Sequence, residues 1–239
     1  QPHVPGNHRG KDLAREVALD LLRHLEGEVG PAIVHGQQYA HDRKVRFGVS
    51  AQGFRDFDKM AYAGKGISVL NPNRNDDIVR NDKIDFSGLG DYGGILLSPG
   101  PGIPAEAGEL LKLIEFCKYT HPILGICLGH QAIAETFGAS LYNLSRPLHG
   151  HRSVLKKVDE HDPLFEDLAD PIQVGRYHSW VIDPETMPGE LITSSIDEQG
   201  HIMSFYHTEL PIHGIQFHPE SYISDCGSGI IRNWLKMVR

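Results

Sequence analysis

Residues 122–131 of the 239-residue chain read Pro-Ile-Leu-Gly-Ile-Cys-Leu-Gly-His-Gln. The apolar run at 122–126 predicts a buried strand, and a helical pattern follows at residues 129–137. Glycines two residues to either side of Cys127 permit a tight strand-to-helix turn, the geometry of a nucleophile elbow, and packing alone does not ask for them. A thiol at a helix N-terminus is favoured as thiolate by the partial positive charge there. The stretch therefore predicts an α/β fold with Cys127 as a nucleophile.

The sequence around this turn alternates between short apolar runs and helical patterns, as α/β sheets do. Residues 94–98 predict a strand and residues 106–119 a helix, and after Gly138 strands dominate until a closing helix at 227–238. We expect these later strands at 153–158, 172–176, 180–183, 191–196, 201–206 and 213–217. The prediction is one α/β domain whose central, largely parallel sheet has helices on both faces (flavodoxin-like), with a small antiparallel patch in the C-terminal half.

The first 77 residues carry weaker signals. Apolar residues at helical spacing predict an amphipathic helix at 11–26. Strands are expected at 45–50 and 66–70 around a helix near 54–63, followed by a loop at 71–77. We therefore divide the chain into an N-terminal extension, residues 1–44, with no assigned role, and a domain, residues 45–239, whose motifs lie within 78–238.

The amino-acid composition limits which partners and which cellular compartment we expect. A hydrophobic content of 40% suffices for a domain core, and 23 basic against 31 acidic residues give a net charge of −8. Without a basic block, nucleic acid is not an expected partner, and the apolar runs are too short to cross a membrane. Three cysteines match neither a disulfide framework nor a zinc site, and no signal peptide is evident, so we expect a cytoplasmic protein.

A nucleophilic thiolate needs a base, and His218 is the best placed of the 15 histidines. It follows the predicted strand 213–217, and Glu220 lies two residues further on, so the pair fits the second and third members of a triad. Alone, the His-Pro-Glu tripeptide is also compatible with a plain turn. His149 and His151 lack carboxylate or cysteine partners at ligand spacing, so no metal site is expected.

The stretch Ser98-Pro99-Gly100-Pro101-Gly102 is a third element. Glycines after a buried strand let backbone N–H groups approach a ligand closely, as an oxyanion hole requires. An ordinary turn is the alternative for this stretch taken alone. It is not a phosphate-binding Walker loop, because the Gly-Lys-Ser/Thr ending is missing.

Four stretches together resemble the class I, triad-type glutamine amidotransferases. They are SPGPGIP at 98–104, GICLGHQ at 125–131, RYHS at 176–179 and FHPES at 217–221, and they occur in the family's order. SPGPG with RYHS is similar to the glutaminase subunits of anthranilate synthase and aminodeoxychorismate synthase. The Asp-Asn-Tyr-Asp-Ser-Phe-Thr-like segment with which family members open has no counterpart before Arg80-Asn81-Asp82.

The resemblance implies a role for each matching position. Cys127 would be the nucleophile, His218 its base and Glu220 the orienter of that base. The residues implied in binding glutamine or its oxyanion are Gly100, Pro101, Gly102, Leu128, Gln131, Ser179 and Trp180, the last standing where the family often has Leu.

The implied reaction is hydrolysis of the L-glutamine side-chain amide, with ammonia passing to a chorismate-aminating synthase subunit. Anthranilate synthase is the preferred partner and aminodeoxychorismate synthase the nearest rival. The glutaminase step needs no cofactor, and Mg²⁺ would belong to the synthase. Two alternatives stay open: a cysteine hydrolase or peptidase, which leaves Gln131 and the RYHS stretch without a role, and an inactive scaffold that binds a synthase.

Overall fold

The computed structural model describes residues 46–47, 66–70 and 76–238 of the chain. Within these residues the main element is a nine-stranded sheet with the order β1-β3-β2-β4-β5-β13-β12-β11-β8. Its strands are β1 (Arg46–Phe47), β2 (Gly66–Leu70), β3 (Asp76–Arg80), β4 (Gly94–Leu97), β5 (Ile123–Ile126), β8 (Lys156–Lys157), β11 (Leu191–Ile196), β12 (Ile202–His207) and β13 (Ile212–Ile215).

Parallel pairing lies at the centre of this sheet. β5 pairs in parallel with β4 on one side and with β13 on the other. The flanking pairs are antiparallel: β2 with β3 and β4, and β12 with β11 and β13. Short connections such as residues 197–201 permit only antiparallel neighbours, because a parallel crossover needs a dozen or more residues. The predicted α/β class with a parallel core is confirmed, and the sheet as a whole is mixed.

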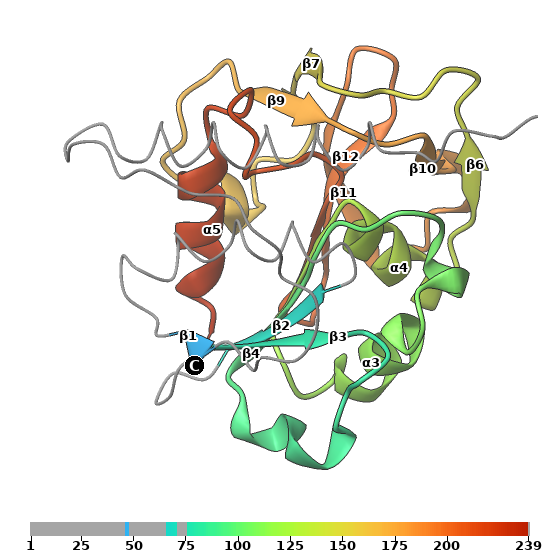
Figure 1. Ribbon diagram of the computed structural model, residues 1–239. Helices are drawn as coiled ribbons and strands as arrows, with labels where there is room; N and C mark the ends of the chain where they lie inside the picture. The colour runs from blue at the N-terminus through green and yellow to red at the C-terminus, as the bar shows by residue number, and fades with distance from the viewer. Residues whose placement is uncertain (1–45, 48–65, 71–75, 239) are drawn as a thin grey trace, which may run out of the picture.

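Helices cover both faces of the sheet (Figure 1). Ile95 and Leu97 of β4 belong to the core cluster under two helices on one face, whereas Leu96 belongs to the opposite cluster with the third helix. This alternation is the period of two that side chains follow along a strand, and it makes β4 apolar throughout. The helices are α3 (Leu110–Cys117), α4 (Leu128–Thr136) and α5 (Gly227–Leu235). The predicted placement of helices on both faces is confirmed.

Two small antiparallel sheets lie in the C-terminal half, as predicted. One pairs β6 (Leu141–Asn143) with β10 (Trp180–Ile182), and the other pairs β7 (His151–Val154) with β9 (Gln173–Arg176). The sequence did not indicate β6, which is short and largely exposed and so lacks an apolar run. The remaining elements are short 3₁₀ helices: η1 (Phe86–Asp91), η2 (Pro104–Glu106), η3 (Pro163–Phe165) and η4 (Pro184–Thr186).

Several predicted boundaries were wrong. The helix expected at 106–119 begins only at Leu110, because Gly108 has a φ of +61° and interrupts the helical backbone. The strand expected at 153–158 is divided between β7 and β8, which belong to different sheets. The loop expected at 71–77 gives way to β3 at Asp76, because pairing with β2 overrides the polar composition.

The N-terminal predictions are tested only in part. The strand at 66–70 is confirmed, and of the strand expected at 45–50 the structure describes β1, residues 46–47. The helices expected at 11–26 and near 54–63, and the extension 1–44, lie outside the described residues. Within the part of the chain that the structure describes, no helix has the length and apolar content needed to span a membrane.

Candidate active site

Cys127 stands at the turn between β5 and α4, where it precedes the first residue of the helix, Leu128. Its backbone has a φ of 52° and a ψ of −99°, a strained conformation for a residue with a side chain. The expectation that packing does not ask for the flanking glycines was wrong: a Cβ on Gly125 would lie 2.5 Å from the backbone of Gly129, and a Cβ on Gly129 would lie 2.6 Å from Leu97. The G-x-C-x-G spacing thus produces the tight elbow expected from it.

Three motif loops meet at one edge of the sheet. β4, β5 and β13 are parallel neighbours, so their carboxyl ends point the same way. Residues 100–102 follow β4, Cys127 follows β5, and His218 comes shortly after β13. Ligands of open α/β sheets bind outside the carboxyl ends of the strands. Of the predicted glutamine loop, Gly100 is half-buried and Pro101 and Gly102 are exposed, and Gly102 has a φ of +81°.

His218 is held by its backbone and by its side chain. Its N–H donates to Gly175 O at 3.0 Å, and its carbonyl accepts from Ser224 Oγ at 2.6 Å. Its imidazole Nδ1 lies 2.6 Å from Oε1 of Glu220, whose side chain is buried. The His-Pro-Glu segment therefore presents a histidine of fixed orientation, with Nε2 left over for another partner.

The charge on His218 depends on Cys127 as well as Glu220. Burial lowers the pKa of the imidazole, but the adjacent Glu220 and Cys127 side chains raise that pKa to about 10. Because Glu220 occupies Nδ1, Nε2 is the ring nitrogen that remains available to Cys127. A protonated imidazole beside a thiolate is the arrangement from which a cysteine attacks a carbonyl carbon.

Gln131 and Trp180, both expected in glutamine binding, are in direct contact. The Nε2 of Gln131 donates to Trp180 O at 2.8 Å and to Gln216 Oε1 at 3.0 Å. Ser179 precedes β10, and its carbonyl accepts from Leu144 N at 2.7 Å. These contacts connect the first turn of α4 to the start of β10.

Two residues of this region had no role in the sequence interpretation. The Tyr177 ring meets the His218 ring edge-on, with centroids 5.0 Å apart, and its hydroxyl lies 3.0 Å from Ser221 Oγ. Gln216 is fully buried beside Gln131. The signal for Gln216 was available: it is a polar residue within the otherwise apolar stretch that ends at Phe217.

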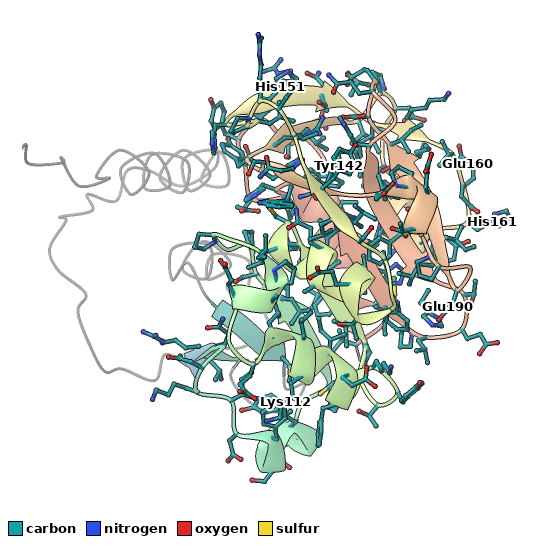
Figure 2. All side chains as sticks on the ribbon, turned by 90° about the vertical axis from the view of Figure 1, so that its right-hand side faces the viewer. Lys112, Tyr142, His151, Glu160, His161 and Glu190 are labelled. Carbon is teal, nitrogen blue, oxygen red and sulfur yellow. The ribbon has the colours of Figure 1, made fainter. Side chains whose placement is uncertain are left out.

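The other two cysteines are buried thiols, and His151 and His161 are exposed at the surface. Cys117 and Cys226 are buried, and burial raises the pKa of their thiols to about 11 and about 12, so both stay protonated at neutral pH. His151 and His161 point outward at the periphery in Figure 2. Among the described residues, no three histidine, cysteine, aspartate or glutamate side chains form a group that would hold a metal ion.

Comparison with known proteins agrees with the motifs. Residues 62–238 match the family model described as glutamine amidotransferase class-I. Anthranilate synthase component 2 of Mycobacterium tuberculosis is 42% identical over 163 residues, which are 68% of each chain. Aminodeoxychorismate/anthranilate synthase component 2 of Bacillus subtilis is 37% identical over 185 residues, 77% of this chain and 91% of the relative.

A solved structure supports the fold assignment. A candidate GMP synthase protein from Thermoplasma acidophilum superimposes with a TM-score of 0.60 at 31% identity, covering 66% of this chain and 78% of that protein. The family resemblance indicated by the four motifs is therefore confirmed. The chain belongs to the class-I glutamine amidotransferase family.

Proposed function

We propose that this chain is the glutaminase subunit of a chorismate-aminating synthase, with Cys127, His218 and Glu220 as its triad. The observation that carries the proposal is the position of Cys127 on a strained elbow beside His218, whose other ring nitrogen is bound to Glu220. Family membership indicates the substrate, which is the side-chain amide of L-glutamine. The roles of the three side chains follow from their chemistry.

In the first half of the reaction, the Cys127 thiolate attacks the side-chain amide carbon of glutamine. The negative charge moves to the amide oxygen, which backbone N–H groups of Gly100, Gly102 and Leu128 stabilise. His218 then gives its Nε2 proton to the amide nitrogen, the C–N bond breaks, and ammonia leaves. The product is a γ-glutamyl thioester on Cys127 and a neutral His218.

In the second half, His218 accepts a proton from water, and the resulting hydroxide attacks the thioester carbon. The C–S bond breaks, glutamate is released, and the thiolate and the protonated imidazole are restored. Glu220 stays ionised throughout and holds the imidazole in orientation. Gln131, Ser179 and Trp180 hold the glutamine backbone. No cofactor takes part in this cycle.

Ammonia would pass to a synthase subunit that aminates chorismate and holds its own Mg²⁺. The support is the naming of the relatives: they are component 2 proteins of anthranilate and aminodeoxychorismate synthases. We place the reaction in tryptophan biosynthesis in the cytoplasm, with anthranilate as product. Aminodeoxychorismate is the second candidate product, because the Klebsiella aerogenes and Bacillus subtilis relatives carry that name.

Covalent trapping tests the glutaminase assignment. The full chain is incubated with 6-diazo-5-oxo-L-norleucine, an electrophilic glutamine analogue, and the adduct is mapped by mass spectrometry. We expect one adduct, on Cys127, and protection by L-glutamine. Absence of that adduct in folded protein would support the scaffold alternative and overturn the proposal.

Nitrogen-source exchange tests the division of labour. A Cys127→Ala protein is mixed with its synthase, chorismate, Mg²⁺ and either glutamine or an ammonium salt. We expect amination with ammonium alone, increasing as pH rises from about 7 to about 8.5 because more of the nitrogen is then NH₃. The aminated product, either anthranilate or the non-aromatic aminodeoxychorismate, identifies which of the two synthases this chain serves. Failure with both nitrogen sources, where wild type with glutamine succeeds, would contradict the proposal.

A further inference from the structure

The backbone of His218 meets strand β9 at Gly175, in an isolated antiparallel bridge. The N–H of His218 donates to Gly175 O at 3.0 Å, one of the two hydrogen bonds that an antiparallel pair of residues can exchange. The second connection passes through a side chain. Gly175 N donates to Ser224 Oγ at 2.9 Å, and Ser224 Oγ donates to His218 O at 2.6 Å. A serine hydroxyl is therefore inserted between the two backbone groups.

Both hydrogen bonds of the Ser224 hydroxyl have a fixed direction. A backbone N–H can only donate, so Oγ accepts from Gly175 N. A backbone carbonyl can only accept, so the hydroxyl proton points toward His218 O. The hydroxyl thus uses its proton and one lone pair at the same time, and a side chain without a hydroxyl can replace neither contact.

Two successive turns return the chain to His218 and place Ser224 beside it. In the first turn Ser221 N donates to His218 O at 3.1 Å, and in the second Ser224 N donates to Ser221 O at 2.8 Å. Close approach to β9 also depends on Gly175, because a Cβ there would lie 2.5 Å from Ser221 Oγ. The position of the Ser224 hydroxyl is therefore set by the backbone on both sides of it.

A second crosslink joins the same two segments one residue further on. Asp225 N donates to Gln173 O at 3.2 Å, and Asp225 Oδ1 accepts from Gln173 N at 3.1 Å. This crosslink runs through Gln173 rather than through His218. Asp225 therefore provides a matched control, since its side chain attaches the same segment to the same strand.

We propose that Ser224 is a positioning residue for the candidate base: its hydroxyl fixes the backbone of His218 against β9 and so sets where the imidazole lies relative to Cys127. The inference rests on the proposed glutaminase function and adds to it a residue outside the triad. β9 leads into the stretch that carries Ser179 and Trp180, which are proposed to hold the glutamine backbone. The hydroxyl thus connects the base to the strand that precedes the proposed glutamine site.

Loss of the hydroxyl has a defined consequence for this connection. The N–H of the buried Gly175 loses its acceptor, and an unpaired buried N–H favours any movement that brings it a new partner. His218 O keeps the donor from Ser221, so the turn itself can persist while it shifts relative to β9. A displacement of about 1 Å in a catalytic group can reduce the rate severely.

The test measures glutamine hydrolysis by the full-length chain with its synthase partner present. Values of kcat and KM are determined for wild type, Ser224→Ala, Ser224→Thr, Ser224→Cys and Asp225→Ala, and circular dichroism checks the fold of each. Threonine keeps a hydroxyl, whereas cysteine has nearly the shape of serine but a thiol that forms only weak hydrogen bonds. Asp225→Ala removes the side-chain contact with Gln173 N and leaves the Ser224 hydroxyl in place.

We expect Ser224→Ala and Ser224→Cys to lower kcat about tenfold, because the base acts in both half-reactions and a small displacement affects both. KM should change less than about twofold, since the hydroxyl contacts Gly175 and His218 rather than the residues proposed to bind glutamine. Ser224→Thr should restore most of kcat. Asp225→Ala should keep kcat within about twofold of wild type, because Asp225 is exposed and acts through Gln173.

Several outcomes overturn the inference. An undiminished kcat in folded Ser224→Ala would exclude a positioning role, as would an equal loss of kcat in Asp225→Ala. A raised KM with unchanged kcat would assign the hydroxyl to glutamine binding instead, and a folded Ser224→Thr as slow as Ser224→Ala would show that the hydroxyl is not the group that matters.

If Ser224→Ala does not fold, an undiminished kcat in folded Ser224→Cys overturns the inference. A wild type that hydrolyses no glutamine contradicts the proposed function itself, which is a different result.

Discussion

The Nδ1 atom of His218 lies 2.6 Å from Oε1 of Glu220, only two residues further along the chain. Proline between them and the backbone contacts of His218 with Gly175 and Ser224 fix this local turn. The proposed base and its proposed orienter therefore come from one segment, whereas the candidate nucleophile follows the neighbouring strand β5.

The first prediction concerns the charge on His218. A raised pKa favours the protonated ring in the folded state, so this contribution to stability is complete below the unfolded value near 6.5 and is lost as pH rises toward about 10. We expect the His218 ring, followed by NMR of its ring protons, to stay protonated between pH 7 and about 9. Glu220→Gln removes one of the charges that sustain His218⁺, so in this variant the ring should lose its proton at lower pH.

Steady-state glutaminase activity separates the two roles. Glu220→Gln should reduce kcat less than His218→Ala, since the base acts in both half-reactions and the orienter acts through it. The reverse order of the two variants would contradict the triad roles.

The second prediction uses the strain at Cys127. Cys127→Ser, Cys127→Ala and Cys127→Gly should each lose glutaminase activity by several orders of magnitude and keep the fold. Because φ is 52°, we expect the Gly variant to be about 0.5–1 kcal/mol more stable than the Ala variant, the opposite of the order at ordinary positions. Urea denaturation measures the difference. An Ala variant more stable than Gly would show that the elbow is not strained.

The third prediction tests the contact between α4 and β4. Gly129→Ala places a methyl group 2.6 Å from Leu97 Cβ and should destabilise the protein by about 1–3 kcal/mol through overpacking. Gly189→Ala is the control, because nothing lies within 4 Å of its added Cβ, and its effect should stay within about 0.5 kcal/mol. Equal effects of the two substitutions in thermal denaturation would contradict this account of the glycine spacing.

The fourth prediction concerns acid. Burial lowers the pKa of His130 and of His178 to about 3, with the charges of His178 on the first and of Arg176 on the second as further causes. The unfolded chain binds protons that the folded state excludes, so stability present above pH 6.5 is lost as pH falls toward 3. Between its folded and unfolded pKa values, each histidine lowers the free energy of unfolding by about 1.4 kcal/mol for each pH unit of acidification. Between about pH 6 and 4.5, the free energy of unfolding of His130→Gln, measured by denaturation, should fall less steeply than that of wild type. An unchanged slope would contradict this prediction.

The fifth prediction addresses residues 1–44. Every residue proposed for catalysis or glutamine binding lies at or after Gly100, so deleting this segment should leave kcat/KM for glutamine hydrolysis within about twofold. Loss of activity in a truncated protein with unchanged circular dichroism would show that the segment contributes to the site.

The sequence by itself determined the α/β class, the elbow at Cys127 and the family. These conclusions rest on local signals: an apolar run that ends at a G-x-C-x-G turn, a histidine and carboxylate two residues apart, and four motifs in a known order. Local spacing suffices there because the turn at Cys127 and the His218–Glu220 contact each depend on a short segment. The family model and the relatives confirm the resemblance.

Only the tertiary structure decided strand direction and the orientation of the Gln131 amide. β2 runs antiparallel to β4, which no local pattern specifies because strand direction depends on the path of the connecting chain. Gln131 bonds to partners 49 and 85 residues away, and the direction of the first bond follows because the Trp180 carbonyl can only accept. A glutamine side chain is nearly symmetric in shape, so only the donors and acceptors that the fold places around it determine which end faces a substrate.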